Sequence, residues 1–199
     1  MNIRKEKVRA FLEKPVAGMR LCVVLAVIFV LCLIPLFVVG LYNAPAIDDF
    51  YYSVQTMPVF RETGSVLQTI AAAVDQVGDT YQEWQGSYAA VFLFALHPAV
   101  FGEAWYAVST FILLGSLVGA NWLFSWVLFR RVLKVDRICW LATTLVVLLL
   151  GIHLVPSPVQ SYYWWNGSIY YTFFVRFLWF SSRLYFWDSM LPKRPGRFI

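Results

Sequence analysis

The chain has 199 residues, of which 60% are hydrophobic and 19% aromatic, whereas only 14% are charged. Soluble domains carry about a quarter of their residues as charged side chains, so this composition is typical of a membrane protein. The net charge of +5 does not indicate a nucleic-acid-binding protein. The basic residues lie beside apolar segments, where such residues act as topology signals at an anionic membrane surface.

The N-terminal region predicts a retained first membrane span. Residues 1–20 are basic and can form a short amphipathic helix on the membrane surface. Residues 21–42 then run without a charged side chain. That length matches the ~20 residues that cross a bilayer and exceeds the core of a signal peptide. We therefore expect the first span to stay in the protein, with the N-terminus in the cytoplasm.

Residues 43–103 are predicted to form a loop on the outer side, rich in carboxylates. Within it, residues 64–77 place apolar side chains on one helical stripe, which suits a helix lying at the membrane interface. Residues 88–101 are apolar but short for a span, and His97-Pro98 interrupts them. A crossing there would put the basic residues 130–137 outside, so we expect an interfacial or re-entrant helix instead.

The predicted fold is an all-α integral membrane protein with about four transmembrane helices and amphipathic or re-entrant helices in the first outer loop. The predicted spans cover about residues 21–42, 104–129, 138–155 and 169–187 of a single membrane domain, 1–199. In this arrangement the basic clusters share the cytoplasmic side of the cell's inner, or plasma, membrane. The last span contains Arg176 and Arg183, so it either faces a polar cavity or lies at the interface.

Adjacent carboxylates, Asp48 and Asp49, follow the first span directly. Such a pair can hold a divalent cation, Mg²⁺ or Mn²⁺, against a phosphate leaving group. One carboxylate can also act as general base on a sugar hydroxyl. The structural alternative is an acidic turn that caps a helix and keeps the loop outside, and the spacing alone favours this alternative.

Two aromatic clusters are candidate sugar-binding elements. The first contains Trp84 and Tyr88, and the second contains Trp165 and Asn166. Flat aromatic faces can pack on a pyranose ring while amides bind its hydroxyls. The alternative for both clusters is an ordinary belt of aromatic residues at the membrane interface.

The order of these motifs resembles the N-terminal part of polytopic GT-C-type membrane glycosyltransferases. The motifs that carry the resemblance are Asp-Asp-Phe-Tyr-Tyr (48–52), Trp-Gln-Gly-Ser-Tyr (84–88) and Trp-Trp-Asn-Gly-Ser-Ile-Tyr-Tyr (164–171). It looks most like a bacterial branch found with surface-polysaccharide genes. Members often have Arg where this chain has Ser87.

The resemblance implies transfer of a sugar from a polyprenyl-phosphate carrier to a glycan acceptor at the outer face. It makes Asp48 and Asp49 the candidate catalytic or metal-binding pair, and Trp84, Tyr88, Trp165 and Asn166 the candidate pocket residues. Members have about twice as many spans, so the chain is expected to be such an enzyme or an N-terminal portion of one. The alternative is a small non-catalytic membrane protein that binds a membrane-protein partner. A channel or transporter is disfavoured, because the first three predicted spans lack buried charges.

Overall fold

The computed structural model describes residues 15–173, and within them every regular element is helical. The long helices are α2 (Pro15–Gly40), α7 (Ala107–Ser125) and α8 (Arg137–His153). The shorter helices are α3 (Ile47–Tyr52), α4 (Thr56–Thr63), α5 (Val66–Glu83), α6 (Tyr88–Ala95) and α9 (Trp165–Ser168). The remaining turns are η1 (Pro98–Phe101), η2 (Glu103–Tyr106), η3 (Trp126–Val132), η4 (Val159–Tyr163) and η5 (Ile169–Phe173). The predicted all-α class is confirmed for this part of the chain.

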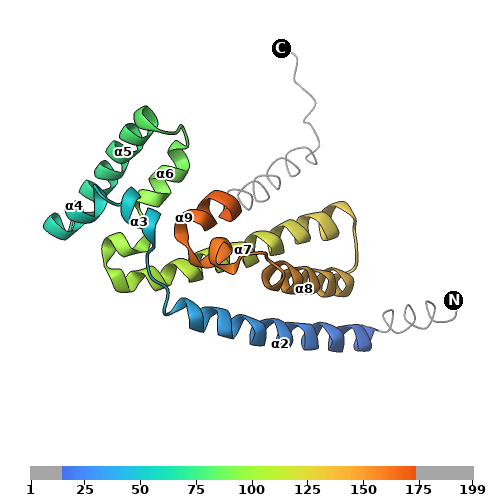
Figure 1. Ribbon diagram of the computed structural model, residues 1–199. Helices are drawn as coiled ribbons and strands as arrows, with labels where there is room; N and C mark the ends of the chain where they lie inside the picture. The colour runs from blue at the N-terminus through green and yellow to red at the C-terminus, as the bar shows by residue number, and fades with distance from the viewer. Residues whose placement is uncertain (1–14, 174–199) are drawn as a thin grey trace, which may run out of the picture.

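Helices α2, α7 and α8 lie side by side, and α3 to α6 gather at one end of them (Figure 1). The inward positions of α2 recur every three or four residues, as the 3.6-residue turn requires. Its buried side includes Cys22 and Phe29, and it ends at Gly40. A Cβ on Gly40 would lie 2.6 Å from Cγ2 of Thr110, so glycine allows α2 to approach the start of α7.

Two segments are long and apolar enough to cross a membrane, by length and composition. They are Gly18–Gly40 in α2, and Glu103–Val132 through η2, α7 and η3. These correspond to the predicted spans 21–42 and 104–129. The predicted span 138–155 corresponds to α8, which is apolar but has only 17 residues. Of the predicted span 169–187, residues 174–187 lie outside the described residues.

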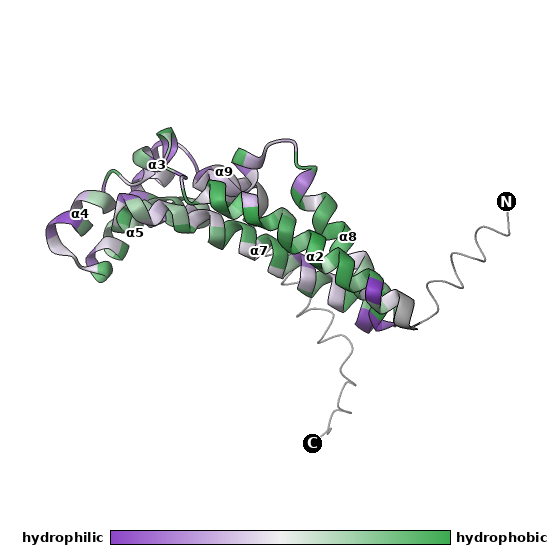
Figure 2. Ribbon diagram, turned by 90° about the horizontal axis from the view of Figure 1, so that it is seen from below, coloured by the Kyte–Doolittle hydropathy of each residue, from purple (hydrophilic) through white to green (hydrophobic). Residues whose placement is uncertain are grey.

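The surface of α2 is apolar, in contrast to the ends of the molecule. Figure 2 shows hydrophobic residues along α2, α7 and α8, with hydrophilic residues toward both ends. Large side chains exposed on α2 include Val23, Val27, Leu31, Ile34 and Val38. A contiguous apolar surface of this kind is typical of a membrane or protein contact.

The predicted amphipathic helix 64–77 is present as the longer helix α5. Its apolar stripe does not face the fold, because Leu67 and Val74 are exposed. The side that packs on the neighbouring helices carries small or polar residues, including Thr69, Ala73 and Gln76. The apolar side chains of α5 are thus available for a contact outside the described fold.

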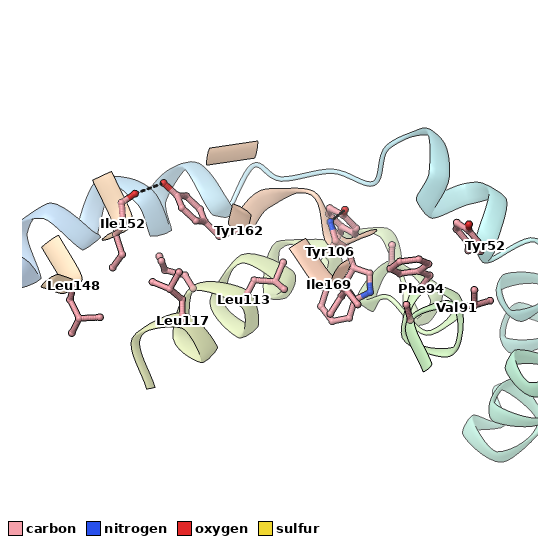
Figure 3. Close-up of a cluster of buried hydrophobic side chains, with 14 of the residues drawn as sticks. Tyr52, Val91, Phe94, Tyr106, Leu113, Leu117, Leu148, Ile152, Tyr162 and Ile169 are labelled. Atoms are coloured by element: carbon pink, nitrogen blue, oxygen red, sulfur yellow. Dashed lines mark hydrogen bonds between the residues drawn. The ribbon is translucent and has the colours of Figure 1, made fainter. Parts of the chain in front are cut away.

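The segment 88–101 is not one continuous helix. It is divided into α6 and η1 around His97, whose backbone precedes the first turn of η1. Buried side chains form a continuous cluster from Leu148 and Ile152 in the bundle to Phe94 and Tyr52 at the other end (Figure 3). This cluster joins the bundle to the layer that carries the acidic pair.

Candidate functional site: a buried and a half-exposed carboxylate

The acidic pair lies in the first turn of α3, at the second and third helical positions. Asp49 reaches back one turn, and its Oδ2 accepts a hydrogen bond of 2.8 Å from the N–H of Ala46. An acidic side chain at the third position stabilises a helix start in this way, since the first N–H groups lack partners within the helix. Helix capping therefore explains why an acidic residue stands at position 49.

Asp49 is also the centre of long-range contacts and is 0% exposed. The Tyr106 hydroxyl donates to its Oδ2 at 2.5 Å. The same hydroxyl accepts a hydrogen bond of 3.1 Å from the N–H of Trp165. Asp49 thus connects α3 to the start of α7 and to α9, which lie far apart in the sequence.

Burial raises the pKa of the Asp49 carboxyl above its ordinary value. The hydrogen bonds from Ala46 and Tyr106 act in the opposite direction, as does the backbone N–H of Asn166. Desolvation is the largest of these effects, so the protonated carboxyl is favoured relative to a carboxyl in water. A raised carboxyl pKa in a buried setting is one mark of a functional site.

His97 supports Asp49 through the backbone. Its Nε2 lies 3.0 Å from the Asp49 carbonyl oxygen. Because a carbonyl only accepts, Nε2 carries the proton in this contact. The ring is fully buried and packs edge-on against Tyr106, with ring centres 5.8 Å apart. Burial lowers the pKa of His97 to about 4, so the imidazole is neutral at physiological pH.

Several buried polar atoms near Asp49 have no hydrogen-bond partner among the residues that the structure describes. They are Oδ1 of Asp49, Nδ1 of His97, Nε1 of Trp164, and both side-chain polar atoms of Asn166. Buried polar groups are nearly always paired in folded proteins, so these atoms are where a bound water or a ligand group would be accommodated.

Asp48 has a different environment, because neighbouring residues of a helix point in directions about 100° apart. It is half-buried and lines a groove of about 580 Å³ at the end of α2. The groove is lined mainly by apolar and aromatic side chains, namely Val39, Tyr42, Asn43, Ala44, Ala46, Ile47, Val159, Tyr163 and Trp164. Asp48 is the one residue among them with a charged side chain.

Asn43 lines this groove and links the elements around it by hydrogen bonds. Its Nδ2 donates to the Tyr163 carbonyl at 2.6 Å and lies 3.3 and 3.2 Å from the hydroxyls of Ser109 and Thr110. The end of α2 is thereby tied to α7 and η4. This junction sets the position of Asp48, which is the second residue after the loop 43–46 that Asn43 begins.

The candidate pocket residues fall in two places. Trp165 and Asn166 are buried beside Asp49, and the indole Nε1 of Trp165 donates to the Leu93 carbonyl at 2.9 Å. Trp84 and Tyr88 are each 68% exposed on the outer surface. The structure therefore does not bring Trp84 and Trp165 into one enclosed cavity with the acidic pair.

The two carboxylates of the acidic pair also differ in their access to a metal ion. No group of three or more His, Cys, Asp or Glu side chains suited to a metal ion exists among residues 15–173. Asp49 Oδ2 already accepts two hydrogen bonds, so Asp48 offers the accessible carboxylate. Mg²⁺ is often held by one or two carboxylates together with substrate phosphates and water, and Asp48 suits that mode.

Tyr106 is the functional residue that sequence reasoning missed. It lies at the entry of a long apolar segment, where a tyrosine is ordinarily part of an interfacial belt. Nothing in the spacing shows that its hydroxyl meets a carboxylate 57 positions earlier.

Comparison with family models, curated proteins and solved structures found no match for the chain.

Proposed function

We propose that the chain is a multi-pass membrane protein that forms all or part of a GT-C-like glycosyltransferase. The membrane part of this proposal is supported by the two helices long enough to cross a bilayer and by the exposed apolar side chains of α2. Helix α8 and the segment beginning at η5 would complete a four-span bundle.

The charges at the two ends of the bundle support an orientation with the N-terminus in the cytoplasm. Basic residues lie at one end, where α2 begins, α7 ends and α8 starts; they are Arg20, Arg130, Arg131, Lys134 and Arg137. The opposite end carries Asp48, Asp49 and the acidic residues of α5. Lys and Arg near span ends mark the cytoplasmic side, so the acidic pair would face outward.

The observation that carries the enzymatic proposal is the position of Asp48 in the groove at the outer end of α2. The apolar lining suits a lipid-linked donor, and the carboxylate suits a general base. Asp48 would take the proton of an acceptor hydroxyl while that oxygen attacks the anomeric carbon of the sugar. The bond from that carbon to the carrier phosphate would break, and the phosphate would leave with the electron pair.

The alternative role for Asp48 is as a ligand that would hold a divalent cation against the donor phosphate, and in that role it would not also act as the base. Bound there, Mg²⁺ or Mn²⁺ would stabilise the charge on the leaving phosphate. Asp49 has a different role, because its carboxylate is buried and hydrogen-bonded to Tyr106. It fixes the start of α3 and so fixes Asp48.

The experiment uses membranes containing the full chain, with radiolabelled glucose or galactose on a polyprenyl phosphate as donor. Asp48→Asn keeps the size of the side chain and removes the base. We expect transfer to fall by a factor of about 100 or more, the usual contribution of a general base. Asp49→Asn is expected to lower both transfer and thermal stability.

Asp75→Asn is the matched control, because Asp75 is exposed on α5, away from the groove. It should transfer at the wild-type rate. Wild-type transfer in both the Asp48→Asn and Asp49→Asn variants would contradict the enzymatic assignment and leave the non-catalytic partner subunit. A wild-type chain that transfers neither sugar would contradict the proposal that this chain is a whole enzyme.

A further inference from the structure

We infer that the outer surface carries a second site, a ledge that binds one pyranose ring of a neutral glycan. The ledge consists of exposed aromatic and polar residues from α3, from the α5–α6 connection and from η5. Its members are Tyr51, Trp84, Gln85, Ser87, Tyr88 and Tyr170. The inference deepens the proposed function by assigning where the acceptor glycan docks, although binding itself does not require catalysis.

Trp84 is exposed but rigidly supported. Its ring is stacked on that of Tyr52, with the planes 6° apart and the centroids separated by 6.5 Å. Tyr51 contacts it edge-on at 6.1 Å. Tyr52 itself is buried, so the indole has a fixed backing. A large aromatic face held in this way can receive the apolar C–H face of a sugar, whose hydrogens are attracted by the negative ring face.

Polar groups beside Trp84 are held in place by one another. The side-chain amide of Gln85 donates to the Tyr52 hydroxyl at 2.8 Å, and its oxygen accepts from Tyr170 at 3.4 Å. The Tyr170 hydroxyl also lies 2.7 Å from the Ser87 hydroxyl. The Gln85 amide and the Ser87 hydroxyl each have further donor or acceptor capacity. A ligand with several hydroxyls could therefore bind without first ordering these side chains.

The surface is also hollowed next to these groups. A depression of about 220 Å³ is lined by Gly86, Ser87, Tyr88, Ala89, Ala90 and Tyr170. Drug-sized ligands occupy sites of about 300–1,000 Å³, so this depression suits a single ring. Small residues form much of it, and the aromatic rings of Tyr88 and Tyr170 border it.

The lack of charged side chains on the ledge favours a neutral ligand. The members of the ledge are all uncharged, and Glu83 is the charged residue that precedes it directly. A basic partner would need carboxylates, which no member of the ledge carries, and an anionic lipid headgroup would find no cation on the ledge. A neutral saccharide matches both the aromatic face and the uncharged polar groups.

The test measures glycan binding by the purified full-length chain in lipid nanodiscs. The probes are maltohexaose, galactohexaose, mannohexaose and chitohexaose, studied by saturation-transfer NMR and calorimetry. We expect at least one of them to bind, with saturation transferred to the ring C–H protons. Trp84→Ala should weaken that binding by about tenfold or more, as removal of one stacking platform does for nucleic-acid bases. Trp84→Phe should retain part of the affinity.

Trp105→Ala is the matched control. Trp105 is similarly exposed, at 61%, but belongs to η2 and is not part of the ledge. Binding should be unchanged in this variant. Asp48→Asn should lose transfer but keep glycan binding, which separates failure of the ledge from failure of the proposed enzyme.

Three results would overturn the ledge. The first is a wild-type chain that binds none of the four oligosaccharides, and the second is a Trp84→Ala variant that binds as tightly as wild type. The third concerns quenching of tryptophan fluorescence by brominated lipids: the quenched signal is lost in Trp84→Phe but kept in Trp105→Phe. That result would place the Trp84 ring in the bilayer interface and identify the surface as a membrane contact.

Discussion

Asp49 is a carboxylate in a place where a charge is costly. Its oxygens have left water, and Tyr106 together with the Ala46 N–H replaces part of the lost hydration. Leaving such a buried group without its partner costs about 1–3 kcal/mol, or more for a charge. The residue is thus retained at an energetic cost, and its contacts explain why α3, α7 and α9 meet at this point.

The buried pair of His97 and Asp49 predicts a specific dependence of stability on pH. The folded pKa of His97, about 4, lies below the ordinary value of 6.5, so the unfolded chain takes up a proton first as the pH falls. The stabilisation is complete above pH 6.5 and is lost as the pH falls toward 4. The loss can reach about 3 kcal/mol.

Asp49 acts with the opposite sign. Its folded pKa is raised, so its contribution is complete below its unfolded pKa and is lost as the pH rises through the folded value. It therefore offsets part of the His97 effect in acid. Thermal unfolding in detergent between pH 4 and 7.5 should show a stability loss in acid that is reduced in His97→Gln. Glutamine keeps an N–H donor for the Asp49 carbonyl but does not titrate.

His153→Gln is the control for this measurement, since His153 is exposed at the end of α8. It should follow the wild-type profile. The same acid sensitivity in His97→Gln and wild type would show that His97 is not the group responsible.

At the scale of residues, the sequence predicts the acidic pair but not its division of labour. Asp48 and Asp49 are chemically identical and adjacent, and only the orientation of α3 sends one into the core and one into the groove. Trp165 and Asn166 were expected as pocket residues because of their type. The position of Trp165 depends on long-range hydrogen bonds to Tyr106 and Leu93, which no local pattern encodes.

Among the elements, α2 and α7 approach each other closely at Gly40. The nearest Thr110 atoms would be 2.6 to 3.0 Å from a Cβ at position 40, closer than real Cβ contacts. We predict that Gly40→Ala destabilises the fold by about 1–3 kcal/mol, the usual range for overpacking. Thermal unfolding in detergent measures the change.

Thr110→Ser should partly rescue Gly40→Ala, because serine lacks the methyl group but keeps the hydroxyl that faces Asn43. Gly115→Ala is the control within α7, where an added Cβ meets nothing within 4 Å. It should be neutral or stabilising by about 0.5–1 kcal/mol through helix propensity. Equal stability of wild type and Gly40→Ala would mean that the two helices can separate at no cost.

The elements show where periodicity succeeds and where it does not. A charge-free stretch predicts α2 well, because membrane-length helices depend on composition over many residues. The stripe on α5 predicts a helix whose apolar side lies at the membrane interface, and these apolar side chains are indeed exposed. The stripe does not show what the other side contacts. That side uses Ala72, Ala73 and Thr80, since small residues allow close contact with α4 and α6.

For the molecule as a whole, the proposed orientation can be tested by labelling cysteines. Cys139 is exposed in the first turn of α8, at the basic end. With Cys22 and Cys32 replaced by alanine, an impermeant maleimide should label Cys139 in right-side-out vesicles only after permeabilisation. In a cysteine-free chain, Glu62→Cys, in the exposed end of α4, should be labelled without it. Labelling in the reverse order would invert the topology and place the acidic pair in the cytoplasm.

The contacts of Asp49 also set an order of events during synthesis. The ribosome completes α3 long before it reaches Trp165, whose N–H binds the Tyr106 hydroxyl that in turn binds Asp49. Until α9 has been made and has docked, this series of hydrogen bonds is incomplete, and water must hydrogen-bond to the Asp49 carboxylate instead. The groove beside Asp48 also needs Tyr163 and Trp164 as walls. The acidic pair is therefore made as a hydrated, unfinished turn and acquires its two different environments only when the chain after α8 packs against it.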